Sequence, residues 1–171
     1  MCLQLDRKYN QFRLKSILSE HKKTISAIAW NPRNPNIFAT ASYENKIIVW
    51  DVNEQKPIAT FDNLKNPPIA IDWCLLHGEA VSYIHGRGPL YMWQYKGTTL
   101  AVSSVKESSG FSSEVLCFKW HPKKFETVVF GHKDGSISLC TLGKEFIILN
   151  IIPHLHKFLL LYSKLMKLAG S

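Results

Sequence analysis

Residues 25–51 read ISAIAWNPRNPNIFATASYENKIIVWD, and the spacing of the tryptophans in this stretch decides the fold. A tryptophan is followed twenty residues later by a second one, and this interval occurs again further along the chain. The pairs that share the interval are Trp30 and Trp50, Trp73 and Trp93, and Trp120 and Cys140. Their leading tryptophans lie 43 and 47 residues apart. A period of about 40–45 residues is typical of an architecture built from repeats.

Each repeat contains short segments that alternate with the period of a β-strand. Ile28 and Trp30 lie two residues apart on the first segment, and Pro32 ends it because proline donates no hydrogen bond to a ladder. Second strands are expected at residues 37–42, 80–85 and 127–132, and third strands at residues 47–50, 90–93 and 137–140. Fourth strands are expected at residues 57–61 and 98–105, and an equivalent strand at residues 14–18 precedes the first repeat.

The segments between the second and third strands carry turn residues. Asp134-Gly135 and the Gly-Arg-Gly-Pro run at residues 86–89 are strong turn signals, because these residue types accept a positive φ or preset φ. Each repeat therefore comprises about four short antiparallel strands with no helix between them, which is the composition of one propeller blade. The predicted fold class is all-β, a partial β-propeller of about three four-stranded antiparallel blades with a C-terminal helix.

The first repeat carries residues that resemble the signature of the WD-repeat family. These residues are His21, Thr40, Glu44, Trp50 and Asp51. The resemblance covers residues 13–145 and is strongest in the first repeat. It implies that the histidine, the hydroxyl residue, the acid of the turn and the tryptophan form a buried, hydrogen-bonded tetrad, which here would be His21, Thr40, Glu44 and Trp50.

The repeats depart from this signature to different degrees. In the first repeat the turn acid is Glu44, which is one methylene longer than the aspartate of the family. The second repeat has Arg87 at the acid position and Tyr83 at the hydroxyl position. The third repeat keeps the acid as Asp134, and its other three positions are Phe111, Phe130 and Cys140. Only the first repeat is therefore expected to build the tetrad.

Thr40, His21 and Glu44 are also the residue types of a nucleophile, a base and an orienting acid. The structural interpretation is favoured, because a buried polar group left without a partner costs about 1–3 kcal/mol. In addition, the sequence shows no nucleophile elbow and no oxyanion-hole motif beside these residues. We therefore expect a protein that is not an enzyme and that needs no cofactor.

The cysteines do not predict a metal site. They are Cys2, Cys74, Cys117 and Cys140, none of them at C-x₂-C spacing, and a buried free cysteine behaves as a small apolar residue. The N-terminal segment lacks the apolar core of a signal peptide, and no run of eighteen apolar residues predicts a membrane-spanning helix. These features favour a reducing, cytoplasmic location without disulfides.

The net charge of +8 makes a nucleic-acid or membrane-surface binder the alternative function. The basic residues are dispersed in pairs such as Arg7-Lys8, Lys22-Lys23 and Lys123-Lys124. The aromatic residues follow the strand period, which favours a place in the core over a stacking platform for bases. Nucleic-acid binding is therefore disfavoured.

Three repeats are too few for a closed propeller, which uses about 4–8 blades. We therefore expect either a piece of a longer propeller protein or a truncated isoform. The expected division is a leading segment at 1–20 that carries the outer strand of a preceding blade, repeats at 21–62, 63–105 and 106–145, and a divergent tail at 146–171.

The tail is rich in Ile, Leu and Lys, and Pro153 can occupy the first turn of a helix. Residues 151–171 have apolar side chains at helical spacing, although additional leucines interrupt the polar face. Three interpretations remain open. The helix covers the last blade, it contacts a partner or an anionic membrane surface, or it is a variant C-terminus from alternative splicing without an evolved role, which we favour.

The resemblance to WD-repeat proteins implies a non-catalytic scaffold that binds other proteins through the loops on one face of the propeller. Contact residues of the family lie early in the first strand and just before the turn acid. In this chain those positions are Thr24, Ser26 and Tyr43, and Lys133 is the equivalent of Tyr43 in the third repeat. Tyr43 is the strongest candidate, because an exposed tyrosine is a good interface anchor.

Overall fold

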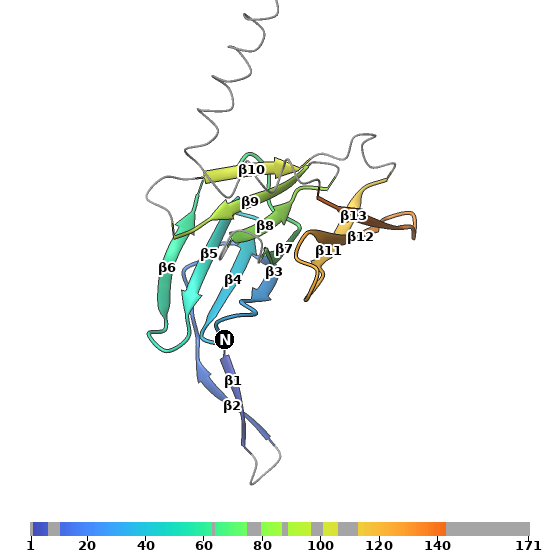
Figure 1. Ribbon diagram of the computed structural model, residues 1–171. Coiled ribbons are helices and arrows are strands. Elements are labelled where there is room, and N and C mark those ends of the chain that lie inside the picture. The colour runs from blue at the N-terminus through green and yellow to red at the C-terminus, as the bar shows by residue number, and fades with distance from the viewer. Residues whose placement is uncertain are drawn as a thin grey trace, which may run out of the picture.

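The computed structural model describes residues 2–6, 11–62, 64–74, 80–86, 89–96, 101–105 and 113–142 (Figure 1). Every secondary-structure element within these ranges is a β-strand, and the strands form four antiparallel sheets. Three of the sheets correspond to the three repeats, so the prediction of an all-β fold built from repeated antiparallel sheets is confirmed. The predicted C-terminal helix lies outside the described residues.

The first repeat forms a four-stranded sheet. Its strands are β3 (Ile25–Trp30), β4 (Ile37–Ser42), β5 (Lys46–Asp51) and β6 (Lys56–Phe61), paired in sequence order. Short connections between consecutive strands favour this pairing of neighbours. The register places Thr40 of β4 between Ile28 of β3 and Ile48 of β5, in the middle of the sheet.

The second and third repeats have the same order of strands. The second sheet contains β7 (Ala70–Cys74), β8 (Ala80–Ile84), β9 (Leu90–Gln94) and β10 (Ala101–Val105). The third sheet contains β11 (Val115–Trp120), β12 (Thr127–His132) and β13 (Ile137–Thr141). Within the described residues no fourth strand pairs with β13.

A two-stranded sheet precedes the first repeat. β2 (Gln11–Ser16) corresponds to the strand expected at residues 14–18 and begins three residues earlier than expected. β1 (Cys2–Asp6), which pairs with β2, was not predicted, because the polar and charged sequence of this segment gives no clear strand pattern. The other strand bounds differ from the predicted ones by up to three residues.

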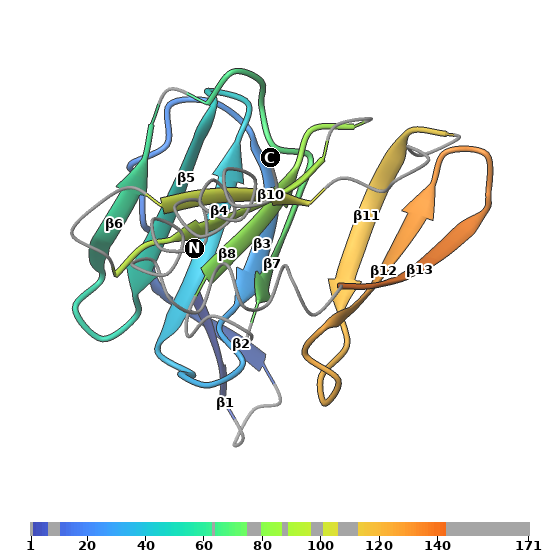
Figure 2. The ribbon, with the colours of Figure 1, turned by 45° about the horizontal axis from the view of Figure 1, so that its top comes forward.

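The three larger sheets lie side by side in the order of the repeats, with β7 between β3 and β11 (Figures 1 and 2). One apolar core joins the first and second sheets and includes Val49, Trp73 and Trp93. A second apolar core joins the second and third sheets and includes Met92 and Trp120. Each sheet therefore contributes one face to the contact with the next sheet, which is the packing expected of consecutive blades.

The loop after each Trp-x-Pro element has a side-chain cap. In the first sheet Asn31 Oδ1 accepts hydrogen bonds from the backbone N–H groups two and three residues further on, at 2.8 and 3.0 Å. In the third sheet His121 Nδ1 accepts the equivalent two bonds at 3.0 and 2.9 Å. An acceptor at this position closes the loop between the first two strands of the sheet, and both residue types can supply one.

The leading tryptophans share a sequence position but differ in burial. Trp73 and Trp120 are buried between sheets, with 2% and 8% of their surface exposed. Trp30 is 57% exposed, so the expectation that the aromatic residues lie in the core is wrong for this tryptophan. The reason is that this tryptophan faces away from the next sheet, toward the side where a preceding blade would stand.

Candidate functional site

The four tetrad residues form one chain of hydrogen bonds across the first sheet. The Trp50 indole N–H donates to Thr40 Oγ1 at 2.8 Å, and Thr40 Oγ1 lies 2.7 Å from His21 Nε2. His21 Nδ1 lies 2.5 Å from Glu44 Oε1. An ionised Glu44 can only accept, so His21 donates from Nδ1 and its Nε2 accepts the Thr40 hydroxyl proton. Every donor in the chain is then paired, from the indole to the carboxylate.

The longer acid of this tetrad is anchored twice. Glu44 Oε2 accepts the backbone N–H of Lys22 at 3.2 Å, while Oε1 faces His21. Burial works to raise the pKa of Glu44, but the hydrogen bonds from His21 and from Lys22 prevail and lower it below its ordinary value. Glu44 therefore links the loop before β3 to the turn between β4 and β5 as a carboxylate.

The same geometry argues against nucleophilic chemistry at Thr40. This side chain is buried, and its hydroxyl oxygen already contacts Trp50 and His21. A nucleophile must reach its substrate, and here the two partners and the sheet occupy the space around the oxygen. Thr40, His21 and Glu44 are therefore hydrogen-bonded to one another within the sheet and its loops.

The turn that carries Tyr43 is held by backbone and side-chain hydrogen bonds. Asn45 adopts a positive φ of 63° and donates its N–H to Ser42 O at 3.2 Å, which is a three-residue hairpin loop with a left-handed residue. The Tyr43 N–H donates to Thr24 O at 3.0 Å. Tyr43 and Thr24, both exposed, are therefore presented side by side on a fixed turn.

The third sheet repeats this turn with charged residues. Gly135 stands at the position of Asn45 with a φ of 86°, and the Lys133 N–H donates to Glu114 O at 2.9 Å. Lys133 Nζ also lies 3.3 Å from Glu114 Oε2, at the positions that Tyr43 and Thr24 hold in the first sheet. Lys133 is thus exposed on the same kind of turn, where its charge is partly matched by Glu114.

The remaining candidate from the sequence, Ser26, has a different place. Its hydroxyl donates to Pro68 O at 2.6 Å, and the residue is half-buried. This bond joins the first sheet to the segment that leads into the second. The Ser26 hydroxyl is therefore engaged within the molecule, whereas Thr24, Tyr43 and Lys133 face solvent.

Comparison with known proteins shows what the first repeat resembles. The family model described as "WD domain, G-beta repeat" matches residues 12–51, which include the whole tetrad. This part of the chain is therefore similar to a WD repeat. The matched segment runs from β2 through β5, so the WD match and the hydrogen-bonded chain lie on the same strands.

Similar proteins extend the likeness beyond the first WD repeat. The yeast Maintenance of telomere capping protein 5 is 20% identical over 133 residues, or 77% of this chain and 11% of that protein. The Dictyostelium discoideum Protein transport protein SEC31 is 25% identical over 138 residues, or 78% of this chain and 10% of that protein. The human GATOR2 complex protein WDR59 is 21% identical over 137 residues, or 80% and 14%.

These proportions show that the chain spans only about a tenth of the length of the relatives that it matches. The matches are spread over diverse WD-repeat proteins. The matches show similarity to larger WD-repeat proteins in general, and they give no support for a specific resemblance to WD repeat-containing protein 17.

The second WD-type sheet fills its tetrad positions with aromatic rings. Tyr83 stands in place of the hydroxyl residue and Trp93 keeps the closing tryptophan, and Phe61 from β6 contacts both rings at centroid distances of 5.9 and 5.3 Å. Tyr83 also stacks on Tyr91 at 5.1 Å. Burial in this aromatic cluster raises the pKa of the Tyr83 phenol well above its ordinary value.

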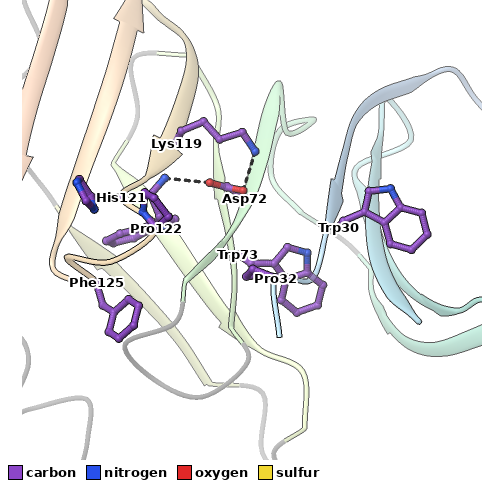
Figure 3. A pocket seen from close by; sticks show the side chains of 9 residues that line it. Trp30, Pro32, Asp72, Trp73, Lys119, His121, Pro122 and Phe125 are labelled. Atoms are coloured by element: carbon purple, nitrogen blue, oxygen red, sulfur yellow. Dashed lines mark hydrogen bonds and ion pairs between the residues drawn. The ribbon is translucent and has the colours of Figure 1, made fainter. Parts of the chain in front are cut away.

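A cavity of about 260 Å³ lies where the first strands of the three sheets end (Figure 3). Asp72 stands in its wall, with Oδ1 2.8 Å from Lys119 Nζ and Oδ2 accepting the Trp120 backbone N–H at 2.9 Å. The cavity is also lined by Trp30, Pro32, Trp73, His121, Pro122 and Phe125. Both oxygens of the carboxylate are therefore already used to join the second sheet to the third.

Asp72 and Lys119 were not predicted from the sequence. Asp72 occupies the position that Ala29 has in the first WD repeat, and nothing in the repeat pattern marks it as polar. A signal existed only in the alternation of β7, where Asp72 falls between the apolar Ile71 and Trp73. That pattern would suggest a solvent-facing residue, but the neighbouring sheet covers it.

The described part of the chain contains no group of three or more His, Cys, Asp or Glu side chains placed to hold a metal ion. Cys74 is buried, Cys117 is exposed and Cys140 is half-buried. The exposure of Cys117 differs from the expected burial, because it lies on the face of the third sheet that no other described sheet covers. The described residues include no helix that is long and apolar enough to cross a membrane.

Proposed function

We propose that this chain is a non-catalytic WD-repeat scaffold for protein–protein interaction, and that its repeats belong to a larger propeller protein, either as a piece or as a shortened form. The observation that carries the proposal is the exposed pair of Tyr43 and Thr24 on a turn fixed by the tetrad and by a 3.0 Å backbone hydrogen bond. A rigid turn loses little conformational freedom on binding, which favours affinity.

The chemistry of this surface suits another protein. Tyrosine supplies a large, amphipathic contact at a low entropic cost and is enriched among residues that dominate binding. One of the similar proteins, GATOR2 complex protein WDR59, is by its name a member of a complex. The small share of each relative that this chain spans supports the idea that its repeats come from a larger propeller.

The charged alternative has less support. Four lysines among the described residues form ion pairs with carboxylates, namely Lys46 with Asp62, Lys56 with Glu54, Lys119 with Asp72, and Lys133 with Glu114. A lysine paired in this way contributes less to a field that attracts phosphates. The excess of positive charge is therefore not presented as one continuous basic surface by these residues.

The test is a photo-crosslinking comparison in cell extract. A photoreactive phenylalanine analogue in place of Tyr43 is expected to give discrete protein adducts, and the matched control carries the same analogue in place of Phe125, a half-exposed aromatic residue in the opposite loop of the third sheet. Adducts obtained at Tyr43 should disappear when wild-type protein competes and should persist when Tyr43→Ala protein competes. Equal adduct patterns at the two positions would refute the proposed surface.

A further inference from the structure

The contact between consecutive sheets uses the same positions each time. Ile47 and Val49 of β5 are 0% exposed because the second sheet covers them, and their equivalents Leu90 and Met92 of β9 are 1% and 2% exposed beneath the third sheet. The equivalents in β13, Ile137 and Leu139, are 75% and 73% exposed. The third sheet therefore carries a contact face of the same construction, and no other described sheet packs on it.

We call this surface the Leu139 face, consisting of Val129, Ile137 and Leu139. Val129 lies directly opposite Leu139 in the ladder and is 36% exposed, so the three side chains share one side of β12 and β13. Apolar side chains gathered on one face of a sheet are normally covered, because water around them is unfavourable. The first and second sheets show what the cover is: the inner strand of another sheet.

The other half of the same contact is exposed at the opposite end of the array. Trp73 and Trp120 pack against the preceding sheet, and their indole N–H groups donate to Ala29 O and to Ser82 Oγ, each at 2.9 Å. Trp30, the equivalent of both, is 57% exposed, and Ile28 beside it is 60% exposed. We call Ile28 and Trp30 the Trp30 face. Trp30 holds the position at which Trp73 and Trp120 pack against the preceding sheet.

We propose that, where these 171 residues are the shortened form of the larger propeller proposed above, a second copy of this chain covers both faces, with the Trp30 face of each copy packed on the Leu139 face of the other. The chain already makes this contact twice within itself, so the two exposed faces are complementary by construction. A head-to-tail contact either closes into a ring or continues as a filament. Two copies with three sheets each give six blades, which lies within the range of closed propellers of about 4–8 blades.

The position of β2 supports the same arrangement independently. β6 ends nine residues before β7 begins and β10 ends ten residues before β11 begins, and β2 likewise ends nine residues before β3 begins. β2 therefore has the place of a fourth strand that belongs to the preceding sheet, while β13 has no fourth strand among the described residues. In the two-chain ring β2 of one copy pairs with β13 of the other, along the edge of β2 that β1 does not occupy.

The first test measures the mass of the whole 171-residue chain in solution by sedimentation and light scattering. Wild type is expected to have the mass of two chains, and Trp30→Asp and Leu139→Arg are each expected to lose the two-chain species. Phe125→Ala is the matched control, because it removes an exposed aromatic side chain in the loop before β12, outside both faces, and it should retain the pair. A monomeric wild type overturns the proposal, and so does an open series of larger species.

Mixing the two variants distinguishes a head-to-tail contact from a symmetric one. The Trp30→Asp chain has an intact Leu139 face and the Leu139→Arg chain has an intact Trp30 face, so a mixture should regain a two-chain species through one intact contact. No recovery on mixing, with both variants folded by circular dichroism, would overturn the head-to-tail arrangement. If either variant fails to fold, the next measurement decides instead.

That measurement places a photoreactive phenylalanine analogue at position 139 in an equal mixture of ¹⁵N-labelled and unlabelled chains. The expected adduct joins position 139 to the peptide around Trp30 of a differently labelled chain. An adduct within one chain, to residues 143–171 or to any other segment, would show that the chain covers its own face and would overturn the proposal. Neither measurement depends on Tyr43, so this inference and the proposed protein-binding function can fail separately.

Discussion

The first blade (β3–β6) and the second blade (β7–β10) carry different kinds of side chain at the equivalent tetrad positions. In the first blade Thr40 and Trp50 belong to a chain of hydrogen bonds that ends at the Glu44 carboxylate. In the second blade Tyr83 and Trp93 belong to a cluster of aromatic rings. Both blades have the same strand order and an antiparallel ladder, so the backbone of a blade does not require the polar tetrad.

The hydrogen-bonded chain of the first blade and the aromatic cluster of the second depend on different features of their side chains. A hydrogen-bonded chain depends on every partner, because removing one member leaves the others buried and unpaired. An aromatic cluster depends on filled volume and on the neutral state of its phenols. The two blades should therefore respond differently to truncation, to loss of a partner and to pH.

The largest effect is expected from Trp93→Ala in the second blade. This side chain is buried and contacts Phe61 and Tyr95, so its removal leaves a cavity between the first two blades. Truncation of a buried tryptophan costs about 3–5 kcal/mol in the free energy of unfolding. Urea denaturation should show this loss, while the exposed Tyr43→Ala control should unfold near the wild-type midpoint. A wild-type midpoint for Trp93→Ala would mean that the cluster does not hold the blades together.

A smaller loss is expected from His21→Ala in the first blade. The substitution leaves Glu44 and Thr40 without their shared partner, and a buried unpaired group costs about 1–3 kcal/mol. Glu20→Ala, in the adjacent exposed position, is the matched control and should change little. The sharper readout is a double-mutant cycle with Thr40→Val, because coupling through one chain makes the two losses non-additive. Additive losses would separate the residues into independent contacts.

The two blades should also lose stability at opposite ends of the pH scale. The pKa of Glu44 is lowered in the folded state, so its contribution is present above its ordinary pKa near 4.5 and is lost as the pH falls through the folded value. The pKa of Tyr83 is raised, so the folded state loses stability above the ordinary pKa near 10.0, by about 1.4 kcal/mol for each pH unit.

The measurement is the unfolding midpoint as a function of pH for wild type and two variants. Glu44→Gln should remove part of the acid dependence, and Tyr83→Phe should remove part of the alkaline dependence. Each variant serves as the control for the other, because each leaves the opposite blade intact. If both variants changed the same limb of the profile, the assignment of the limbs to separate blades would be wrong.

The tetrad residues could be selected from the sequence because all four lie within thirty residues and follow a known spacing. The strand order followed equally well from the periodic tryptophans and the turn residues. The exposure of Trp30 could not be predicted, because its local pattern is the same as that of Trp120, and only the neighbouring sheet decides burial. The role of Asp72 between two sheets was missed for the same reason, since its partners lie 47 and 48 residues away.

The smallest effect is expected from Glu44→Asp, which gives the first blade the shorter acid of the WD-repeat signature. In this chain the backbone places the turn so that the longer side chain reaches His21 at 2.5 Å and the Lys22 N–H at 3.2 Å. Asp is one methylene shorter, so one of the two contacts must lengthen, and a weakened hydrogen bond costs about 0.5–1.5 kcal/mol. Urea denaturation beside Glu44→Gln, which keeps the length but not the charge, separates reach from ionisation. A gain in stability for Glu44→Asp would contradict this prediction, and it would show that the turn moves to keep both contacts with the shorter acid.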